Sequence, residues 1–409
     1  MRAGRRVGGE PFVCVRGDGP YAYDAEGRRY VDYVMGYGPL LFGHTPPFLR
    51  DLDGVAARGV GFGSTTPDEL ELARRIRSHL PSMEKLRFTT TGSEAVQSAI
   101  RVARAYTGRD TVLKFAGNYH GHFDLALQDA GASAETPHPE RSGIPRAVTS
   151  DLAVARYNDL GDADRHLARI GDRLAAIVVE PVCGNMGLVE PVAGFLEGLR
   201  ARAGRCGAVL IFDEVITWLR LGLGGAQARL GVTPDLTTIG KIMGGGFPVA
   251  AFGGRADVMA VLAPDGPCFT GGTHAGMPFG MAIALRVLDH LEANPSLYRE
   301  MDRRARMLAS AMRATLRALE LDYAVLQTES IVDFKFRPGP PARSYDDQQR
   351  DDQRAYAAFY HAMRDRGVLL PPSHNEVMFL STAHGDDDVA LTADAVDASL
   401  RELRAKGVV

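Results

Sequence analysis

The chain has 409 residues, 45% hydrophobic and 24% charged, a balance typical of a globular protein with two domains or one large α/β domain and an appendage. Its net charge of −3 gives no electrostatic footprint for nucleic acid or an anionic membrane, and no stretch reaches the roughly 18 apolar residues of a membrane helix. Four scattered cysteines lack the spacing of a disulfide framework or a zinc site. We therefore expect a soluble, cytoplasmic protein without a metal.

The order of predicted elements indicates a parallel sheet covered by helices. Strands are expected at residues 11–16, 22–24, 29–33 and 85–89, with helices at 68–79 and 93–106. Four continuously apolar strands, typical of strands buried on both faces, follow at 111–115, 175–180, 209–213 and 250–253. Helices at 353–366 and 391–406 and strands at 368–370 and 377–380 complete the chain. Residues 125–149 and 338–352 are predicted loops.

Lysine is rare in this chain, and one lysine stands in an unusual setting. Only five of the 47 basic residues are lysines, and Lys241 lies in a glycine-rich apolar stretch. An amine can form a Schiff base where a guanidinium cannot, and an apolar setting lowers its pKa. Asp213 ends a predicted buried strand, at the edge of the sheet where ligands bind in doubly wound folds. Lys241 follows the next apolar stretch and is expected at the same edge.

Two further features complete a set that matches one cofactor. Gly92 and Ser93 open a predicted helix, whose N-terminal backbone N–H groups can bind an anion. Tyr119 supplies an aromatic ring that can stack on another ring. A reactive lysine, a buried carboxylate, an anion site and a stacking aromatic are the requirements for pyridoxal 5′-phosphate (PLP), with the carboxylate keeping the pyridine nitrogen protonated.

Matching stretches run nearly from end to end of the chain. They include Gly92-Ser93-Glu94-Ala95, Tyr119-His120-Gly121-His122, Glu180-Pro181-Val182, Gly184-Asn185-Met186-Gly187, residues 213–220, residues 241–248 and Pro372-Ser373 with Glu376. Through them the chain resembles the class III (subgroup II) aminotransferases of PLP fold type I, and within them the glutamate-1-semialdehyde 2,1-aminomutase branch. The resemblance implies an α/β fold with a large PLP-binding domain at 49–290, built on a mostly parallel seven-stranded sheet. A smaller α+β domain would be formed by both chain ends, 1–48 and 291–409.

The resemblance also assigns roles in cofactor binding. Lys241 would form the Schiff base and move a proton, and Asp213 would pair with the pyridine nitrogen. The other cofactor contacts would come from Gly92 and Ser93 at the phosphate, Val215 and Tyr119 on the two ring faces, Asn185 at the 3′-oxygen, and Thr273 at the phosphate of the neighbouring subunit. The active unit would therefore be a homodimer, with pyridoxamine 5′-phosphate (PMP) as the alternate cofactor form. Asn185 matters because Ile216 stands where many relatives have glutamine.

The substrate residues depart from the aminomutase pattern. Arg2 resembles the arginine that holds the substrate carboxylate, and Glu376 resembles a residue that binds a substrate amino group. Tyr37, however, replaces a tryptophan of the substrate site, Trp218 replaces a glycine near the pocket, and Met277 lies in an altered stretch. These departures favour a specialised aminotransferase acting on a small amino acid or amino aldehyde. True glutamate-1-semialdehyde 2,1-aminomutase, a β-amino-acid aminotransferase, another PLP reaction and an inactive PLP-binding protein stay open.

Overall fold

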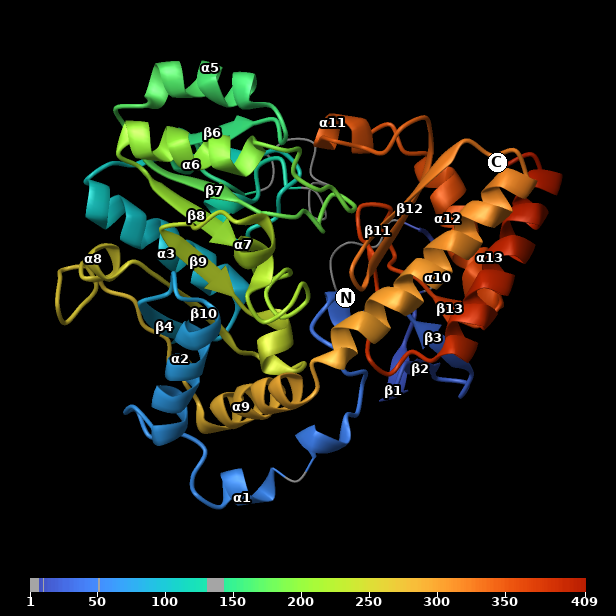
Figure 1. The fold of residues 1–409 in the computed structure, drawn as a ribbon, viewed down its shortest axis with the longest axis horizontal. Coiled ribbons are helices and arrows are strands. Elements are labelled where there is room, and N and C mark those ends of the chain that lie inside the picture. Colours follow the sequence, from blue (N-terminus) through green and yellow to red (C-terminus); the bar gives the residue numbers. More distant parts are fainter. Residues whose placement is uncertain (1–6, 10, 51, 131–142) are drawn as a thin grey trace.

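The computed structural model describes residues 7–9, 11–50, 52–130 and 143–409. Figure 1 shows an α/β unit beside a smaller unit. The sheet of the α/β unit consists, in spatial order, of β4 (Lys85–Thr89), β10 (Ala250–Gly254), β9 (Leu236–Ile239), β8 (Val209–Asp213), β7 (Leu174–Val179), β5 (Thr111–Phe115) and β6 (Leu152–Ala155). β10 pairs antiparallel with both of its neighbours, and the other pairs are parallel. The predicted mostly parallel seven-stranded sheet is confirmed, although the expectation that 250–253 runs parallel is wrong.

The helices of the α/β unit include those that cover the two faces of its sheet. They are α1 (Asp53–Ala56), α2 (Pro67–His79), α3 (Gly92–Thr107), α4 (Arg146–Thr149), α5 (Leu160–Ile170), α6 (Phe195–Cys206), α7 (Gly225–Leu230), α8 (Ala256–Met259) and α9 (Pro278–Ala293), with short 3-10 turns η1 (Met35–Tyr37), η2 (Pro47–Leu49), η3 (Asp124–Ala126) and η5 (Lys241–Gly244). In β8, Ile211 packs into the cluster that contains α3, whereas Leu210 and Phe212 pack into the cluster that contains α5 and α6. Because side chains alternate along a strand, α3 lies on one face and α5 and α6 on the other.

The smaller unit joins the two ends of the chain. One of its sheets holds β1 (Cys14–Asp18), β2 (Tyr21–Asp24), β3 (Arg29–Asp32) and β13 (Val368–Leu369), the other β11 (Tyr323–Thr328), β12 (Ile331–Pro338) and β14 (Met378–Phe379), and its helices are α10 (Ser296–Ala318), α11 (Tyr345–Gln348), α12 (Gln353–Asp365) and α13 (Asp386–Ala405). A single hydrophobic cluster contains Tyr30 and Val31 together with Leu308, Phe336 and Leu400. The exact boundaries at 48/49 and 290/291 stay a prediction.

Several helix and loop boundaries differ from those predicted from the sequence. The last helix begins at Asp386 rather than 391, since Asp388 accepts the Gly385 N–H at 2.8 Å and Asp386 bonds Arg303 and Arg304 of α10. These acidic residues therefore cap and anchor the helix. The predicted loop 338–352 contains α11, and the predicted loop 125–149 ends in α4. Residues 131–142 of that loop lie outside the described residues.

Candidate active site

Lys241 begins η5, two residues after β9 ends. Its φ of 46° is left-handed, which costs a non-glycine residue about 1–3 kcal/mol and is typical of functional sites. Burial lowers the pKa of the Lys241 amine, while the negative charges of Glu376 and Glu180 oppose this effect. An amine with a lowered pKa loses its proton more readily and is then a nucleophile and a base. The chain therefore holds a strained, reactive amine at the edge of its central sheet.

Asp213 is the last residue of β8 and is only 5% exposed. Its Oδ1 accepts the Val215 N–H at 3.1 Å and the Thr238 hydroxyl at 3.2 Å, and its Oδ2 lies 2.8 Å from His120 Nδ1. Hydrogen bonds of this kind favour the charged form of a buried carboxylate. Carboxylate oxygens accept more than one bond each, so Asp213 can still bind a protonated ring nitrogen in the cavity.

The N-terminus of α3 forms the third part of the site. The Thr91 hydroxyl accepts the Glu94 N–H at 3.3 Å, and the Glu94 carboxylate accepts the Thr90 N–H at 2.7 Å, which together fix the helix start. The first N–H groups of a helix have no partner within the helix itself. Gly92 and Ser93 contribute such groups, and the helix dipole adds positive potential. This helix start can bind a phosphate.

Two glycines allow the walls of the site to approach this helix. A Cβ at residue 92 would lie 3.0 Å from Val215 Cγ1. A Cβ at residue 121 would lie 2.6 Å from Ser93 Cα, and Gly121 has a φ of 104° that L side chains rarely adopt. Glycine is therefore required where the loop that carries Tyr119 passes the helix start.

Glu180 fixes the opposite wall. Its Oε1 accepts the Tyr119 N–H at 2.7 Å and its Oε2 accepts the Gly184 N–H at 3.1 Å, so one buried carboxylate holds both the Tyr119 loop and the loop that carries Asn185. Burial raises the pKa of Glu180, and the hydrogen bonds from the Tyr119 and Gly184 N–H groups oppose this. Glu180 is a site residue to which the sequence patterns above assign no role. The sequence does contain a signal for Glu180, namely an acidic residue at the carboxyl end of a buried strand. Glu180 follows β7 directly, much as Asp213 ends β8.

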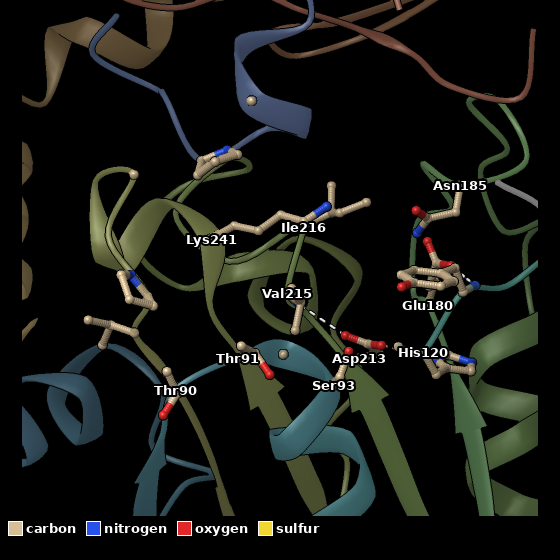
Figure 2. Close-up of a pocket in the computed structure, with 18 of the residues that line it drawn as sticks. Thr90, Thr91, Ser93, His120, Glu180, Asn185, Asp213, Val215, Ile216 and Lys241 are labelled. Carbon is tan, nitrogen blue, oxygen red and sulfur yellow. Dashed lines mark hydrogen bonds and ion pairs between the residues drawn. The ribbon is translucent and has the colours of Figure 1, made fainter. Parts of the chain in front are cut away.

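These groups surround a cavity of about 370 Å³, shown in Figure 2. Of the residues expected to bind the cofactor, those that line it are Gly92, Ser93, Tyr119, Asn185, Asp213, Val215 and Lys241. Ile216 and Glu180 line it as well. In Figure 2, Lys241 extends across the cavity, and Asn185, Glu180 and His120 lie at the other end. The tertiary structure thus brings together residues from five separate stretches of the chain.

The residues expected to bind substrate are placed less uniformly. Glu376 lies near enough to Lys241 for each charge to act on the pKa of the other group. Tyr37 lines a neighbouring cavity of about 710 Å³, which shares Gly36 with the first. Thr273 is exposed and is absent from the lining of the first cavity. Arg2 lies outside the described residues.

Trp218 lies in the core rather than at the cavity, which corrects the expectation of a bulky group at the substrate pocket. Its side chain is fully buried in a cluster with Leu41 and Met281, and its indole N–H donates to the Leu223 carbonyl at 2.9 Å. The turn that follows Asp213 directs it there, through the bond from the Trp218 N–H to the Glu214 carbonyl at 2.9 Å.

The "Aminotransferase class-III" family model matches residues 4–388. The chain belongs to the class III aminotransferase family. It is 45% identical over 405 residues to a glutamate-1-semialdehyde 2,1-aminomutase from Thermomicrobium roseum, covering 98% of this chain and 94% of that protein. Among solved structures, an omega-transaminase from Sphaerobacter thermophilus has a TM-score of 0.91 at 34% identity, covering 99% and 94% of the two chains. A glutamate-1-semialdehyde aminomutase from Pseudomonas aeruginosa PAO1 in complex with PMP has a TM-score of 0.86 at 29% identity, covering 96% and 88%.

This class III aminotransferase is therefore an enzyme of the aminotransferase or aminomutase type with fold type I, as the sequence predicted. No helix within the described ranges has the length and apolar character needed to cross a membrane.

Proposed function

We propose that this enzyme moves an amino group on a small amino acid or amino aldehyde, with PLP held in the cavity around Lys241. PLP, with PMP as its alternate form, is the cofactor of this type of enzyme, and the cavity offers the donor set that it requires. Lys241 would carry the cofactor, Asp213 would bind the pyridine nitrogen, and Gly92 and Ser93 would bind the phosphate. The remaining contacts would be Val215 and Tyr119 on the ring faces and Asn185 at the 3′-oxygen.

The bound cofactor supplies a carbonyl carbon that takes up the substrate amino group and a ring that stores the electron pair left when a proton departs. The residues of the chain have the complementary tasks. Lys241, whose pKa is lowered by burial, can remove a proton at the substrate carbon and return it. Three donors fix the Asp213 carboxylate, and its remaining acceptor capacity can hold a proton on the pyridine nitrogen.

Glu376 carries the proposal about the substrate. Its carboxyl group is half-buried and lies near enough to Lys241 for the two charges to interact. Burial raises its pKa to about 7, with the charge of Lys241 acting in the opposite direction. A carboxylate at this position favours a substrate that carries a positively charged amino group. Glutamate-1-semialdehyde and the product 5-aminolevulinate belong to this class of small amino aldehydes and ketones.

We favour intramolecular transfer, the glutamate-1-semialdehyde 2,1-aminomutase reaction, over intermolecular transamination. Two sequence departures supported a specialised aminotransferase but lie off the cavity lining: Trp218 is in the core, and Met277 contacts the position where Gly61 would carry a Cβ. The Thermomicrobium roseum relative, at 45% identity, also carries the aminomutase name. Intermolecular transamination is the second candidate, supported by the TM-score of 0.91 to the Sphaerobacter thermophilus omega-transaminase.

One experiment separates the two reactions. The purified enzyme loaded with cofactor is supplied with glutamate-1-semialdehyde alone, and 5-aminolevulinate is measured. Repeated turnover without a second amino donor supports the aminomutase. Conversion of bound PLP to PMP by other amino donors, β-amino acids included, together with a strict need for an amino acceptor, supports the aminotransferase. A wild-type enzyme that shows no visible absorbance of bound cofactor would contradict both.

We also propose a homodimer in which Thr273 reaches the cofactor phosphate of the partner subunit. Thr273 is exposed, and Phe269, four residues before it, is 74% exposed. The exposure of this segment leaves both side chains available for an interface with a partner subunit. Light scattering should give the mass of a dimer, and Thr273→Ala should weaken cofactor binding without changing that mass. A monomer with full activity would contradict the proposal.

A further inference from the structure

A pair of buried charges lies on β12 of the smaller unit. Lys335 and Asp333 are neighbours on one face of β12, with Lys335 Nζ 3.0 Å from Asp333 Oδ1 and side chains 2% and 3% exposed. Val332, Phe334 and Phe336, which alternate with them, pack into the hydrophobic core of the smaller unit. The two charges therefore lie on the face of β12 opposite to that core. Neither residue lines the cavity.

Asp333 holds the loop that carries Asn185. Its Oδ2 accepts the Leu188 N–H at 2.8 Å, and Gln348 donates to the Met186 carbonyl next to it. Gly187, between these two contacts, has a φ of 77°, and a Cβ there would lie 2.7 Å from Lys335 Cε and 2.8 Å from Asp333 Oδ2. The backbone of this loop is thus pressed directly against the charged pair.

Lys335 holds the segment that carries Glu376. Its ammonium group donates to the His374 carbonyl, and the Glu376 N–H donates to the Ser373 carbonyl at 3.1 Å. His374 is itself fixed, since its Nδ1 lies 3.2 Å from the buried Asp351 carboxylate. The segment from 373 to 376 is therefore a turn whose position depends on Lys335.

Stability alone does not explain why positions 333 and 335 carry charged residues. A buried ion pair loses much of its attraction to the cost of desolvation, and an apolar pair of similar volume is often equally stable. What an apolar pair cannot do is bond two backbones at once. The direct bond from the Gly187 N–H to the Asn375 carbonyl, at 2.6 Å, joins the same two segments and shows how closely they lie.

We propose that the Asp333–Lys335 pair positions the substrate pocket: Asp333 through Leu188 and Lys335 through His374 hold the segments that carry Asn185 and Glu376 at a fixed separation beside the cavity. The inference rests on the proposed function, in which Asn185 contacts the cofactor and Glu376 contacts an amine-bearing substrate. Lys335 and Asp333 touch neither and are positioning residues.

The test uses the full-length enzyme with cofactor and replaces the pair by Asp333→Leu with Lys335→Met. Each single variant leaves one buried charge unpaired and should lower the thermal midpoint. The double variant should regain part of that loss, because the Leu188 N–H and the His374 carbonyl still lose their partners. The double variant should nevertheless show a KM for glutamate-1-semialdehyde, or for the best amino donor, about tenfold above wild type, with kcat changed less. Cofactor dissociation, followed by its visible absorbance, should be faster. Arg200→Met, which removes a partner of Asp235 at the start of β9, is the control and should leave both constants unchanged.

A second background separates positioning from general loosening. In a Glu376→Gln enzyme the double replacement should raise KM less than twofold, because the residue that the Asp333–Lys335 pair positions is already changed. A stable double variant with wild-type KM and cofactor release would overturn the inference, as would a full tenfold effect in the Glu376→Gln background. If the double variant does not fold, the Asp333→Asn variant is measured in its place. A KM raised about threefold supports the positioning role, and an unchanged KM overturns it. If the wild-type enzyme shows neither cofactor absorbance nor turnover, the proposed function is contradicted. That result differs from those that overturn the positioning role, so the two proposals can fail separately.

Discussion

His120 Nδ1 lies 2.8 Å from Asp213 Oδ2, and the two side chains are only 2% and 5% exposed. Within the part of the chain that the structure describes, His120 Nε2 is buried and has no hydrogen-bond partner. A doubly protonated ring would leave that N–H unsatisfied in the interior. A neutral ring that donates from Nδ1 to Asp213 therefore agrees best with the geometry.

This relationship predicts the effect of Asp213→Asn. The amide keeps the shape of the carboxylate but cannot hold a charged pyridine nitrogen, so kcat should fall roughly 10²- to 10³-fold, the range seen when a buried electrostatic contact to the reacting system is lost. Cofactor should still attach through Lys241. Stopped-flow turnover and the visible spectrum check both points. Asp257→Asn, at an exposed position, is the matched control. A kcat within threefold of wild type would exclude the proposed role.

Lys241→Ala should remove covalent attachment of the cofactor. The variant loses the amine that moves the proton, so turnover should fall by roughly 10²- to 10⁴-fold. Added PLP should be released on gel filtration, whereas wild type retains it. Lys85→Ala changes another of the few lysines, an exposed one paired with Asp265, and should behave as wild type. Retention of cofactor by Lys241→Ala after borohydride treatment and denaturation would show that another group carries it.

Glu376 should give the reaction a pH dependence near neutrality. Its pKa is raised to about 7, so below pH 7 the carboxyl takes up a proton and no longer attracts an ammonium group. KM should therefore rise as the pH falls through 7. Glu376→Gln should raise KM roughly 10- to 100-fold, the value of a hydrogen bond to a charged group, and should abolish that pH dependence. A pH profile of KM that is the same for both enzymes would contradict the role.

The same pKa shift also makes stability depend on pH. Substrate binding should improve as the pH rises, whereas stability should decrease. The pKa of Glu376 in the folded state lies above its ordinary value. At pH values between these two pKa values, the folded state therefore binds more protons than the unfolded state. This contribution is complete below the ordinary carboxyl pKa and is lost as the pH rises through about 7. The thermal midpoint of wild type, relative to Glu376→Gln, should thus fall between pH 5 and pH 8.

Gly121→Ala tests the close approach at the phosphate-binding helix. The added Cβ meets Ser93 Cα at 2.6 Å and the φ of 104° becomes strained, so Ser93 should shift. We expect a loss of about 2–4 kcal/mol in stability, from strain and overpacking together, and a weaker affinity for PLP. Gly108→Ala at the other end of α3 is the control, since it also has a positive φ but no atom lies within 4 Å of its Cβ. Equal PLP affinity in both variants would contradict the role of residue 121.

The sequence by itself determined the cofactor chemistry and most of the cavity. Asp213 ends a strand, and Lys241 and the Gly92-Ser93 helix start each follow one. The carboxyl ends of parallel strands meet at one edge of a sheet. Local patterns were enough, because the sheet converts position along each strand into position in space.

Only the tertiary structure decided what surrounds that cofactor site. Trp218 and Tyr37 were expected at the substrate pocket, yet one packs in the core and the other lines a neighbouring cavity, because the direction of a side chain after a turn depends on distant packing partners. The Asp333–Lys335 pair is likewise invisible along the chain. Its meaning comes from contacts with backbones about 145 and 39 residues away, which no local pattern encodes.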